Sequence, residues 1–381
     1  MYHLILCHAL LTRQYRQLFE MVGYKARPAA PRKRAMSITA LNARLNKIAL
    51  DSIAHNRFFL LKEIAAVFIA ALILVLAMAT LWLAYTRSVF LAVIFFAILS
   101  GGLLAPYLAA MPVLHPRRIR VAFTPADFGI AKWQNVAFFS SDGVELRAWF
   151  IPPDPQSNGA AVVFVHGLGG NRGELLPEAA MLVKHGYGAL LLDLRNHGRS
   201  RGTLTTLGYC EVEDVGGAVA YLQARPEVNP HRIGLFGYSM GGATVLRAAA
   251  RLCQVRAVIA QSAYSSLEEN IARGTIAQAG LPPFLFAPLI VWLGEHATGL
   301  RVNQVRPVDD VAQIAPRAVM FIHGAQDRAI TPDNSRRLYR AANEPKELLL
   351  IEHAEHHQVM QTNLPEYEQR VTKFLDQYLR S

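Results

Sequence analysis

The stretch from Arg232 to Gly242 constrains the fold of this chain more than any other, and it reads Arg-Ile-Gly-Leu-Phe-Gly-Tyr-Ser-Met-Gly-Gly. The apolar residues before Ser239 are typical of a buried strand, and a helix is predicted to begin near Ala243. Glycines lie two positions before and two positions after Ser239, because a turn this tight leaves no room for a side chain. The turn is expected to lift the Ser239 hydroxyl clear of the sheet and to direct the amide of Met240 at the same space.

Beyond Pro116 apolar strands alternate with helices. This alternation predicts an α/β fold with a mostly parallel sheet, whose functional loops lie at the carboxyl ends of the strands. Residues 264–305 interrupt the alternation and are strongly apolar, so we predict a cap inserted over these loops, with an ordinary helical excursion as the alternative. The predicted strands are 136–139, 144–151, 160–165, 188–192, 233–238, 255–260, 318–322 and 348–351, and the predicted helices are 211–224, 242–252, 332–342 and 367–379.

Two further loops carry the residue types that a serine nucleophile requires. A serine hydroxyl is a poor nucleophile at neutral pH, so it needs a base within hydrogen-bond reach and an acid that orients this base. Asp327 follows an apolar strand in the stretch His-Gly-Ala-Gln-Asp. His356 and His357 follow the last strand in the stretch Glu-His-Ala-Glu-His-His-Gln. Three predicted strand ends therefore supply a serine, an acid and a histidine, in that order along the chain.

These motifs resemble the α/β-hydrolase superfamily over about the last 250 residues. Within the superfamily, the chain is most similar to the branch of serine-aminopeptidase-like, monoglyceride-lipase-like and acyl-thioesterase proteins. The resemblance implies an α/β-hydrolase fold, in which helices flank a mostly parallel sheet and form a small cap. The matching stretches are the turn His166-Gly167, the run from Asp193 to Ser200, the serine turn, the turn from His323 to Asp327 and the late histidines.

The resemblance also implies roles for the three candidate catalytic residues. Ser239 is expected to be the nucleophile, Asp327 the acid and His356 the base. The family's last loop usually reads Gly-x-Gly-His, and this chain has His353 and Glu355 where glycines are common. Because of this departure, the adjacent His357 stays open as an alternative base.

The oxyanion hole is assigned by the same resemblance to the backbone amides of Met240 and Leu168. His166, His197 and His323 lie in loop motifs of the superfamily and are predicted to brace turns rather than to transfer protons. No His, Cys or Asp spacing predicts a metal site, and the glycine-rich run after His166 is an oxyanion turn in the superfamily and not a phosphate loop. We therefore expect no metal and no cofactor.

Two uncharged stretches, residues 64–86 and 89–111, precede this domain. As a helix, the first would be about 34 Å long, which is enough to cross the hydrocarbon core of a bilayer. Soluble helices seldom lack charge on every face over this length. We therefore predict a transmembrane hairpin linked at Arg87-Ser88, with a pair of buried helices as the alternative.

The net charge of +11 is concentrated at the amino end. Residues 1–63 hold 11 Lys or Arg and three acids, whereas the chain from Met111 onward holds 27 bases and 25 acids. A nucleic-acid-binding protein would usually concentrate basic residues on its folded domain, so nucleic acid is not an expected partner. Basic residues flank both ends of the hairpin and only Arg87 lies in the link. By the positive-inside rule, the hydrolase domain is expected on the cytoplasmic side of a bacterial inner membrane. Three widely spaced cysteines agree with a reducing compartment.

The predicted organisation is a basic segment at 1–63, a transmembrane hairpin at 64–111 and an α/β-hydrolase domain at 112–381, with the cap at 264–305. The expected function is that of a membrane-anchored serine hydrolase acting on small-molecule or lipid esters or thioesters. A serine peptidase or amidase with the same residues is the main alternative, and a non-catalytic membrane adaptor is another. The sequence leaves open the oligomeric state and whether the chain begins at Met1 or Met36.

Overall fold

The computed structural model describes residues 110–279 and 283–380, together with the isolated positions 74, 75, 78, 93, 94, 100, 101 and 108. Apart from those positions and residues 110 and 111, the predicted basic segment and the predicted hairpin lie outside the described residues. Among the described residues no helix has the length and apolarity that a bilayer span requires. The chain divides into one unit at Met1–Leu104 and a second at Ala105–Ser381, and the second unit holds the sheet.

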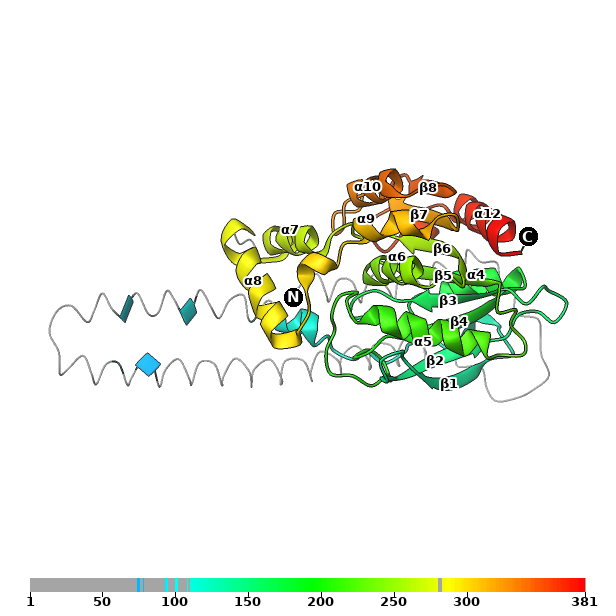
Figure 1. Ribbon diagram of the computed structural model, residues 1–381, viewed down its shortest axis with the longest axis horizontal. Coiled ribbons are helices and arrows are strands. Elements are labelled where there is room, and N and C mark those ends of the chain that lie inside the picture. Colours follow the sequence, from blue (N-terminus) through cyan, green and yellow to red (C-terminus); the bar gives the residue numbers. More distant parts are fainter. Residues whose placement is uncertain are drawn as a thin grey trace, which may run out of the picture. The chain divides into compact units, whose positions relative to one another are not determined.

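An eight-stranded, mostly parallel sheet forms the centre of the second unit, as predicted (Figure 1). The strand order is β1-β2-β4-β3-β5-β6-β7-β8, and only the β1–β2 and β2–β4 pairs are antiparallel. Each of the other pairs is parallel, so β3 to β8 end at one common edge, called here the carboxyl edge. The strands are β1 Gln134–Phe139, β2 Glu145–Ile151, β3 Ala161–Val165, β4 Gly188–Asp193, β5 Ile233–Tyr238, β6 Val255–Gln261, β7 Ala318–Gly324 and β8 Lys346–Ile351.

Apolar packing on both faces of the sheet explains why its central strands are uniformly apolar rather than alternating. Alternate side chains of β3 and β5 enter two separate cores: Val163 and Leu235 pack on one face, and Val162 and Phe236 on the other. Helices α5 Glu211–Gln223, α6 Met240–Arg251 and α10 Asp333–Ala341 cover the first face. Helices α4 Leu176–Lys184 and α12 Leu364–Leu375 cover the second.

The helices differ from the predicted ones in three places. The helix after the serine turn begins at Met240, because the turn passes directly into the first helical residue. The last long helix begins at Leu364 rather than at residue 367, and Pro365 occupies its first turn. Helix α4 was not predicted, and seven of its nine residues are buried.

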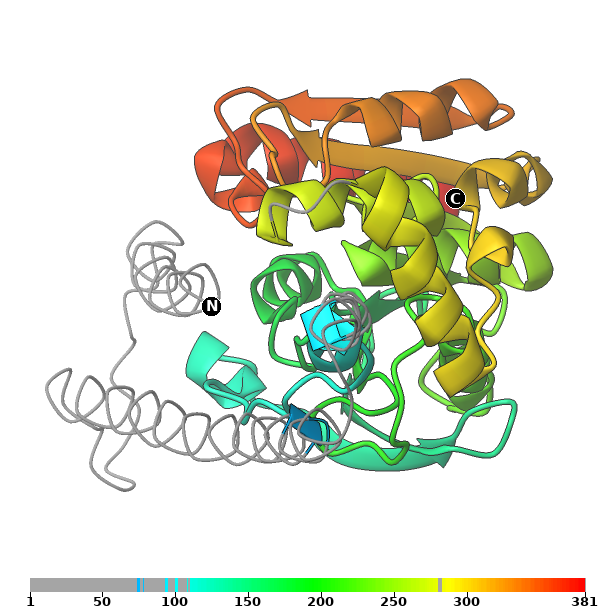
Figure 2. The same cartoon turned by 90° about the vertical axis from the view of Figure 1, so that its left-hand side faces the viewer.

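Two helices, α7 Leu267–Ala279 and α8 Pro283–Thr298, follow β6 and make up most of the segment predicted as a cap. Because β6 ends at the carboxyl edge, both helices leave the sheet from that edge (Figures 1 and 2). The chain returns to β7 through short helical turns. They are η2 Val302–Gln304, α9 Pro307–Asp310 and η3 Val311–Ile314; the remaining short elements are η1 Pro125–Phe128, α11 Val359–Thr362 and the π-helix η4 Asp376–Arg380.

Candidate active site

Ser239 occupies a strained turn between β5 and α6, with φ 55° and ψ −118°. A positive φ is costly for a residue with a side chain and occurs mainly where the surroundings enforce it. Close backbone packing enforces it here, since a Cβ on Gly237 would lie 2.2 Å from the oxygen of Gly241, and one on Gly241 would lie 2.1 Å from the oxygen of Val165. The Ser239 amide also donates to the Gln261 oxygen at the end of β6, at 2.8 Å. The two glycines are therefore required by packing, as the sequence predicted.

A continuous hydrogen-bonded chain joins Ser239, His356 and Asp327. His356 Nε2 lies 3.1 Å from Ser239 Oγ, and His356 Nδ1 lies 2.6 Å from Asp327 Oδ2. An ionised carboxylate can only accept, so Nδ1 carries a proton and Nε2 is left to accept from the serine hydroxyl. This arrangement is the one in which a histidine can remove the serine proton.

His357 lies next to His356 but has a different environment. Its Nδ1 is hydrogen-bonded to the Tyr238 hydroxyl at 2.5 Å. Burial and the nearby His356 ring lower the pKa of His357 to about 4, so that His357 is neutral at neutral pH. His353 points elsewhere, with its Nδ1 3.3 Å from the Gln326 side chain. Of the three late histidines, the structure brings only His356 to Ser239 and Asp327.

Asp327 is buried and is held as a carboxylate by four donors. Its Oδ1 accepts from the amides of Ala329 and Ile330, both at 2.9 Å. Its Oδ2 accepts from His356 and lies 3.1 Å from Nε2 of the buried His323. Burial alone would raise the pKa of Asp327, but the hydrogen bonds from His323 and His356 outweigh it and hold the pKa well below its usual range. Asp327 therefore stays ionised at neutral pH and can accept the hydrogen bond from His356 Nδ1.

His323 was predicted only to brace a turn. The structure shows that it also contacts Asp327 directly. The Nδ1 atom of His323 lies 2.6 Å from the Ser335 hydroxyl, and its Nε2 is also 2.7 Å from the Ile330 oxygen. A carbonyl oxygen only accepts, so Nε2 carries a proton and Nδ1 accepts from Ser335. The pattern of a histidine four residues before an aspartate was visible in the sequence, but the contact depends on the turn between them.

Most amides of the turn after β3 have internal hydrogen-bond partners. The Gly167 amide donates to Glu174 Oε2 at 2.7 Å, and the Gly169 amide donates to His197 Nε2 at 3.1 Å. The Gly170 amide donates to the Gly167 oxygen at 3.2 Å. Within the part of the chain that the structure describes, the Leu168 amide has no internal hydrogen-bond partner, and neither has the amide of Met240. These are the two donors that the sequence assigned to an oxyanion hole.

His166 and His197 brace this turn. His166 donates from Nδ1 to the Gly167 oxygen and accepts the Leu194 amide at Nε2, at 2.7 and 3.0 Å. His197 donates from Nδ1 to the Arg195 oxygen at 2.8 Å. Burial lowers the pKa of both rings, so both are neutral and keep these tautomers at neutral pH.

Glu174 and Glu178 were missed by sequence reasoning, although they lie under the oxyanion turn. Burial raises the pKa of Glu174 to about 7 and that of Glu178 to about 8. Glu178 Oε2 is buried and has no hydrogen-bond partner among the described residues. The sequence did show two acids four positions apart in an apolar stretch. Because helix α4 was not predicted, these acids could not be placed in the fold.

Replacing Glu178 with glutamine is expected to stabilise the fold at alkaline pH. The folded-state pKa of Glu178, about 8, exceeds the ordinary value of 4.5, so the protonated form is favoured by folding. The contribution of the protonated Glu178 side chain to the free energy of unfolding is complete below pH 4.5 and is lost as the pH rises through about 8. The loss is at most about 4 to 5 kcal/mol by pH 9, from the difference between the two pKa values. In thermal unfolding of the full chain, the melting temperature of Glu178→Gln should rise relative to that of wild type between pH 5 and pH 9. A constant difference across that range would contradict the prediction.

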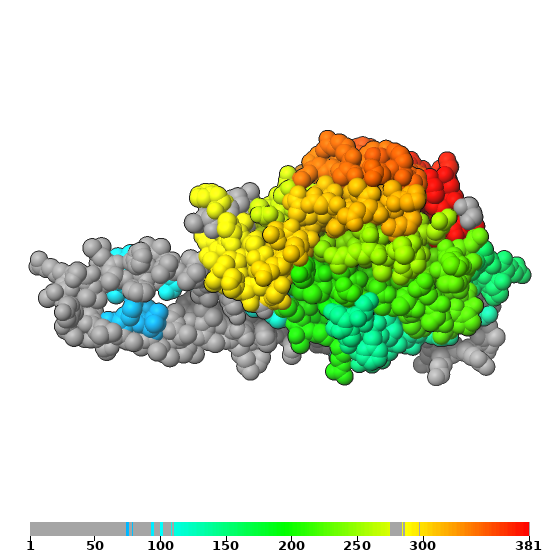
Figure 3. Space-filling model, viewed as in Figure 1, coloured from blue at the N-terminus to red at the C-terminus, as the bar shows by residue number. Residues whose placement is uncertain are grey.

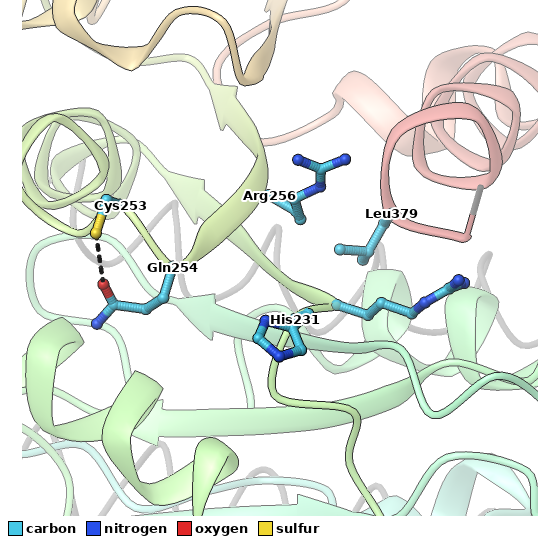
Figure 4. A pocket seen from close by; sticks show the side chains of 6 residues that line it. His231, Cys253, Gln254, Arg256 and Leu379 are labelled. Carbon is cyan, nitrogen blue, oxygen red and sulfur yellow. Dashed lines mark hydrogen bonds between the residues drawn. The ribbon is translucent and has the colours of Figure 1, made fainter.

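A separate hollow of about 350 Å³ lies at the amino ends of β5 and β6 (Figure 4). Ser239 follows the opposite end of β5, so this hollow is on the other edge of the sheet from the candidate site. Across the described ranges, no group of three or more His, Cys, Asp or Glu side chains is arranged to hold a metal ion. The hollow is lined by His231, Arg232, Cys253, Gln254, Arg256 and Leu379.

Comparison with known proteins agrees with the fold. Residues 160–286 match the family described as alpha/beta hydrolase fold. The protein YfhR of Escherichia coli K12 is 31% identical over 236 residues, which cover 60% of this chain and 76% of YfhR. YqkD of Bacillus subtilis is 29% identical over 241 residues, covering 62% of this chain and 77% of YqkD. The solved structure of the Pyrococcus furiosus esterase Pf2001 has 27% sequence identity and a TM-score of 0.59, and it covers 70% of this chain and 98% of the esterase.

The chain belongs to the α/β-hydrolase family. It is a hydrolase of that family, and its structural neighbours include esterases.

Proposed function

We propose that this protein is a membrane-anchored serine hydrolase that cleaves carboxylic esters or thioesters through an acyl-enzyme on Ser239. The observation that carries the proposal is the hydrogen-bonded chain from Ser239 Oγ through His356 to Asp327. Within the superfamily we assign the chain to the branch of serine-aminopeptidase-like, monoglyceride-lipase-like and acyl-thioesterase proteins. The likeness to the Pyrococcus furiosus esterase favours ester over amide substrates.

In the first half of the reaction, Ser239 Oγ bonds to the carbonyl carbon of the substrate while His356 Nε2 takes the hydroxyl proton. The carbonyl oxygen becomes an oxyanion, which accepts hydrogen bonds from the amides of Leu168 and Met240. His356 then gives its proton to the departing alcohol or thiol as the bond to the carbonyl carbon breaks. The second half repeats these steps with water: His356 takes a water proton, the hydroxide oxygen bonds to the acyl carbon, and the carboxylic acid leaves as Ser239 regains its proton.

Asp327 supports both halves by stabilising the imidazolium form of His356. Its own proton affinity is low, because two histidines and two amides donate to it, so it stays charged and does not take the proton itself. Each oxyanion donor is expected to contribute a factor of about 10² to 10³ in kcat, as such donors do in other serine hydrolases.

The membrane anchor in this proposal rests on the two uncharged stretches at residues 64–86 and 89–111. The few described positions in and near them include Leu74, Val75, Ile94 and Leu108, whose apolar side chains are all exposed. Exposed apolar side chains on an uncharged segment suit a lipid environment. The basic residues on both flanks favour a cytoplasmic hydrolase domain. A reporter fused after Ser381 should then behave as cytoplasmic, and an extracytoplasmic signal would refute this topology.

A fluorophosphonate probe tests the enzymatic part directly. The probe should label the wild-type protein in a membrane fraction at one site, and mass spectrometry of the labelled peptide should place the adduct on Ser239. Matched p-nitrophenyl esters, acyl thioesters and aminoacyl amides then compare the substrate classes, with the ester or thioester expected to give the highest kcat/KM. Faster cleavage of the amides would favour a peptidase or amidase. Absence of both labelling and turnover would favour a non-catalytic adaptor.

A further inference from the structure

Residues 110–120, called here the linker, connect the second predicted span to the sheet and are fixed to the carboxyl edge. The Leu114 oxygen accepts from the Thr205 amide at 2.9 Å. The Arg118 guanidinium donates to two carbonyl oxygens of the loop after β4, at 2.5 and 2.7 Å. The Ile119 oxygen accepts from the Asn171 side chain, just after β3, at 3.2 Å. The chain therefore enters the domain beside the loops that follow β3 and β4.

Those same loops hold the oxyanion turn. His197, in the loop after β4, accepts from the Gly169 amide, and Leu168 lies one residue earlier. The linker and the candidate site are thus bound to one pair of loops at one edge of the sheet. A membrane span that ends near residue 111 would bring the bilayer surface to this edge and not to the opposite one.

Exposed large apolar side chains concentrate in the same region. Among the described residues of the second unit, six such side chains are exposed, and five of them belong to the linker and its approach, the oxyanion turn or α8. The sixth is Phe139, at the end of the edge strand β1, which runs parallel to β4. Phe139 therefore lies at the same edge of the sheet, but at its far side, five places from β6 in the strand order. The five are Leu108, Ile119, Leu168, Phe284 and Trp292.

Helix α8 presents the largest of these side chains on one face. Phe284 is 82% exposed and Trp292 is 51% exposed, and Pro288 between them is exposed as well. A spacing of four residues places the three within about 80° around the helix axis. No charged residue occurs in α8 before Glu295. The yellow atoms of this helix lie at the surface in Figure 3, and Figures 1 and 2 both place α8 at the same end of the sheet as residues 110–114. Trp and Phe on such a face are typical of membrane interfaces.

Charge on the linker fits a lipid surface. Arg117, Arg118 and Arg120 lie within four residues, and no acidic residue occurs from residue 64 to residue 126. Arg118 and Arg120 are exposed. Clustered arginines beside a span attract anionic phospholipid headgroups.

We propose that the exposed face of α8, together with the linker, rests on an anionic phospholipid bilayer, so that the site receives amphiphilic acyl esters or thioesters from the membrane rather than from water. This inference rests on the membrane anchor proposed above. Leu168, which is 41% exposed, adds apolar surface next to the open amide. An acyl ester taken up from the bilayer would place its carbonyl group near the two open amides.

Contact with lipid is tested without relying on catalysis. The full chain, with its three cysteines replaced by serine, receives a single fluorophore through Phe284→Cys and is reconstituted in vesicles of phosphatidylcholine and phosphatidylglycerol. Brominated phospholipids are expected to quench this fluorophore. They should leave unquenched a fluorophore at Cys253, in a matched chain that keeps Cys253 as its single cysteine, because Cys253 is exposed before the amino end of β6, on the opposite edge of the sheet. An unquenched fluorophore at position 284 would overturn the proposal. The same result is expected if a second copy of the chain, rather than lipid, covers α8. Equal quenching at both positions would overturn the assignment of the contact to α8.

Delivery of substrate is tested with the double variant Phe284→Ser/Trp292→Ser and the matched control Phe139→Ser. For a long-chain acyl ester in vesicles, kcat/KM should fall about tenfold in the double variant, because its interfacial apolar surface is lost. For a water-soluble short-chain ester, both variants should remain close to wild type, which also reports that they fold. Equal losses on both substrates, or a loss in the control alone, would overturn the inference. If wild type hydrolyses neither ester, the proposed function fails, and the quenching result still decides the contact.

Discussion

Replacing Ser239 with alanine is expected to lower kcat by about 10⁴- to 10⁶-fold, the range found when a serine nucleophile is removed. The loss follows because no other hydroxyl is hydrogen-bonded to His356 in the described structure. The residual rate would come from the open amides of Leu168 and Met240 and from substrate binding. Initial rates on a p-nitrophenyl ester measure the effect, and fluorophosphonate labelling should disappear in parallel.

Stability provides the control for this variant. Alanine keeps the Cβ and hence the strain of φ 55°, so the melting temperature of Ser239→Ala should stay near that of wild type. Glycine removes the strain, and Ser239→Gly should therefore be more stable by about 1 kcal/mol while being equally inactive. Substantial turnover by either variant would refute the assignment of Ser239 as nucleophile.

The second large effect is expected from a pair of adjacent histidine variants. His356→Ala should lower kcat by about 10⁴-fold or more, because it removes the base and leaves the carboxylate of Asp327 without its partner. His357→Ala should lower kcat by less than about tenfold, since that ring is bonded to the Tyr238 hydroxyl and is neutral at neutral pH. Parallel measurements of kcat and KM on one soluble ester compare the two variants.

The pH dependence of each variant separates a catalytic role from a positional one. In both wild type and His357→Ala, kcat/KM should fall at low pH, because a protonated imidazole at His356 cannot accept the serine proton. Absence of this fall in His357→Ala, or a greater loss of kcat there than in His356→Ala, would transfer the role of base to His357.

Local patterns in the sequence were sufficient for much of the fold. The apolar runs predicted the central strands β3 to β7, because strands buried on both faces must be apolar throughout. The edge strand β1 was also predicted, although its residues are mostly exposed. Helix α4 was missed, and the burial of seven of its nine residues is a property of the tertiary structure. Glu174 and Glu178 were missed with it, and their raised pKa values depend on burial that no local pattern reports.

The contacts around Asp327 show a second limit of sequence reasoning. The aspartate itself was predicted from its place after an apolar strand, but its partners come from three separate parts of the chain. His323 precedes it in β7, the amides of Ala329 and Ile330 follow it in the turn, and His356 arrives from the loop after β8. Only the turn geometry and the β7–β8 pairing bring these groups together.

The sequence by itself determined the strand, turn and helix around Ser239, because the requirement is steric and local: Gly237 and Gly241 leave no space for a Cβ. It also determined the order of serine, acid and histidine along the chain. Only the tertiary structure decided which of two adjacent histidines faces the serine, and only it shows why the Leu168 amide in the turn after β3 is left open. Both depend on partners far away in the chain, since Tyr238 holds His357, and Glu174 and His197 hold the amides on either side of Leu168.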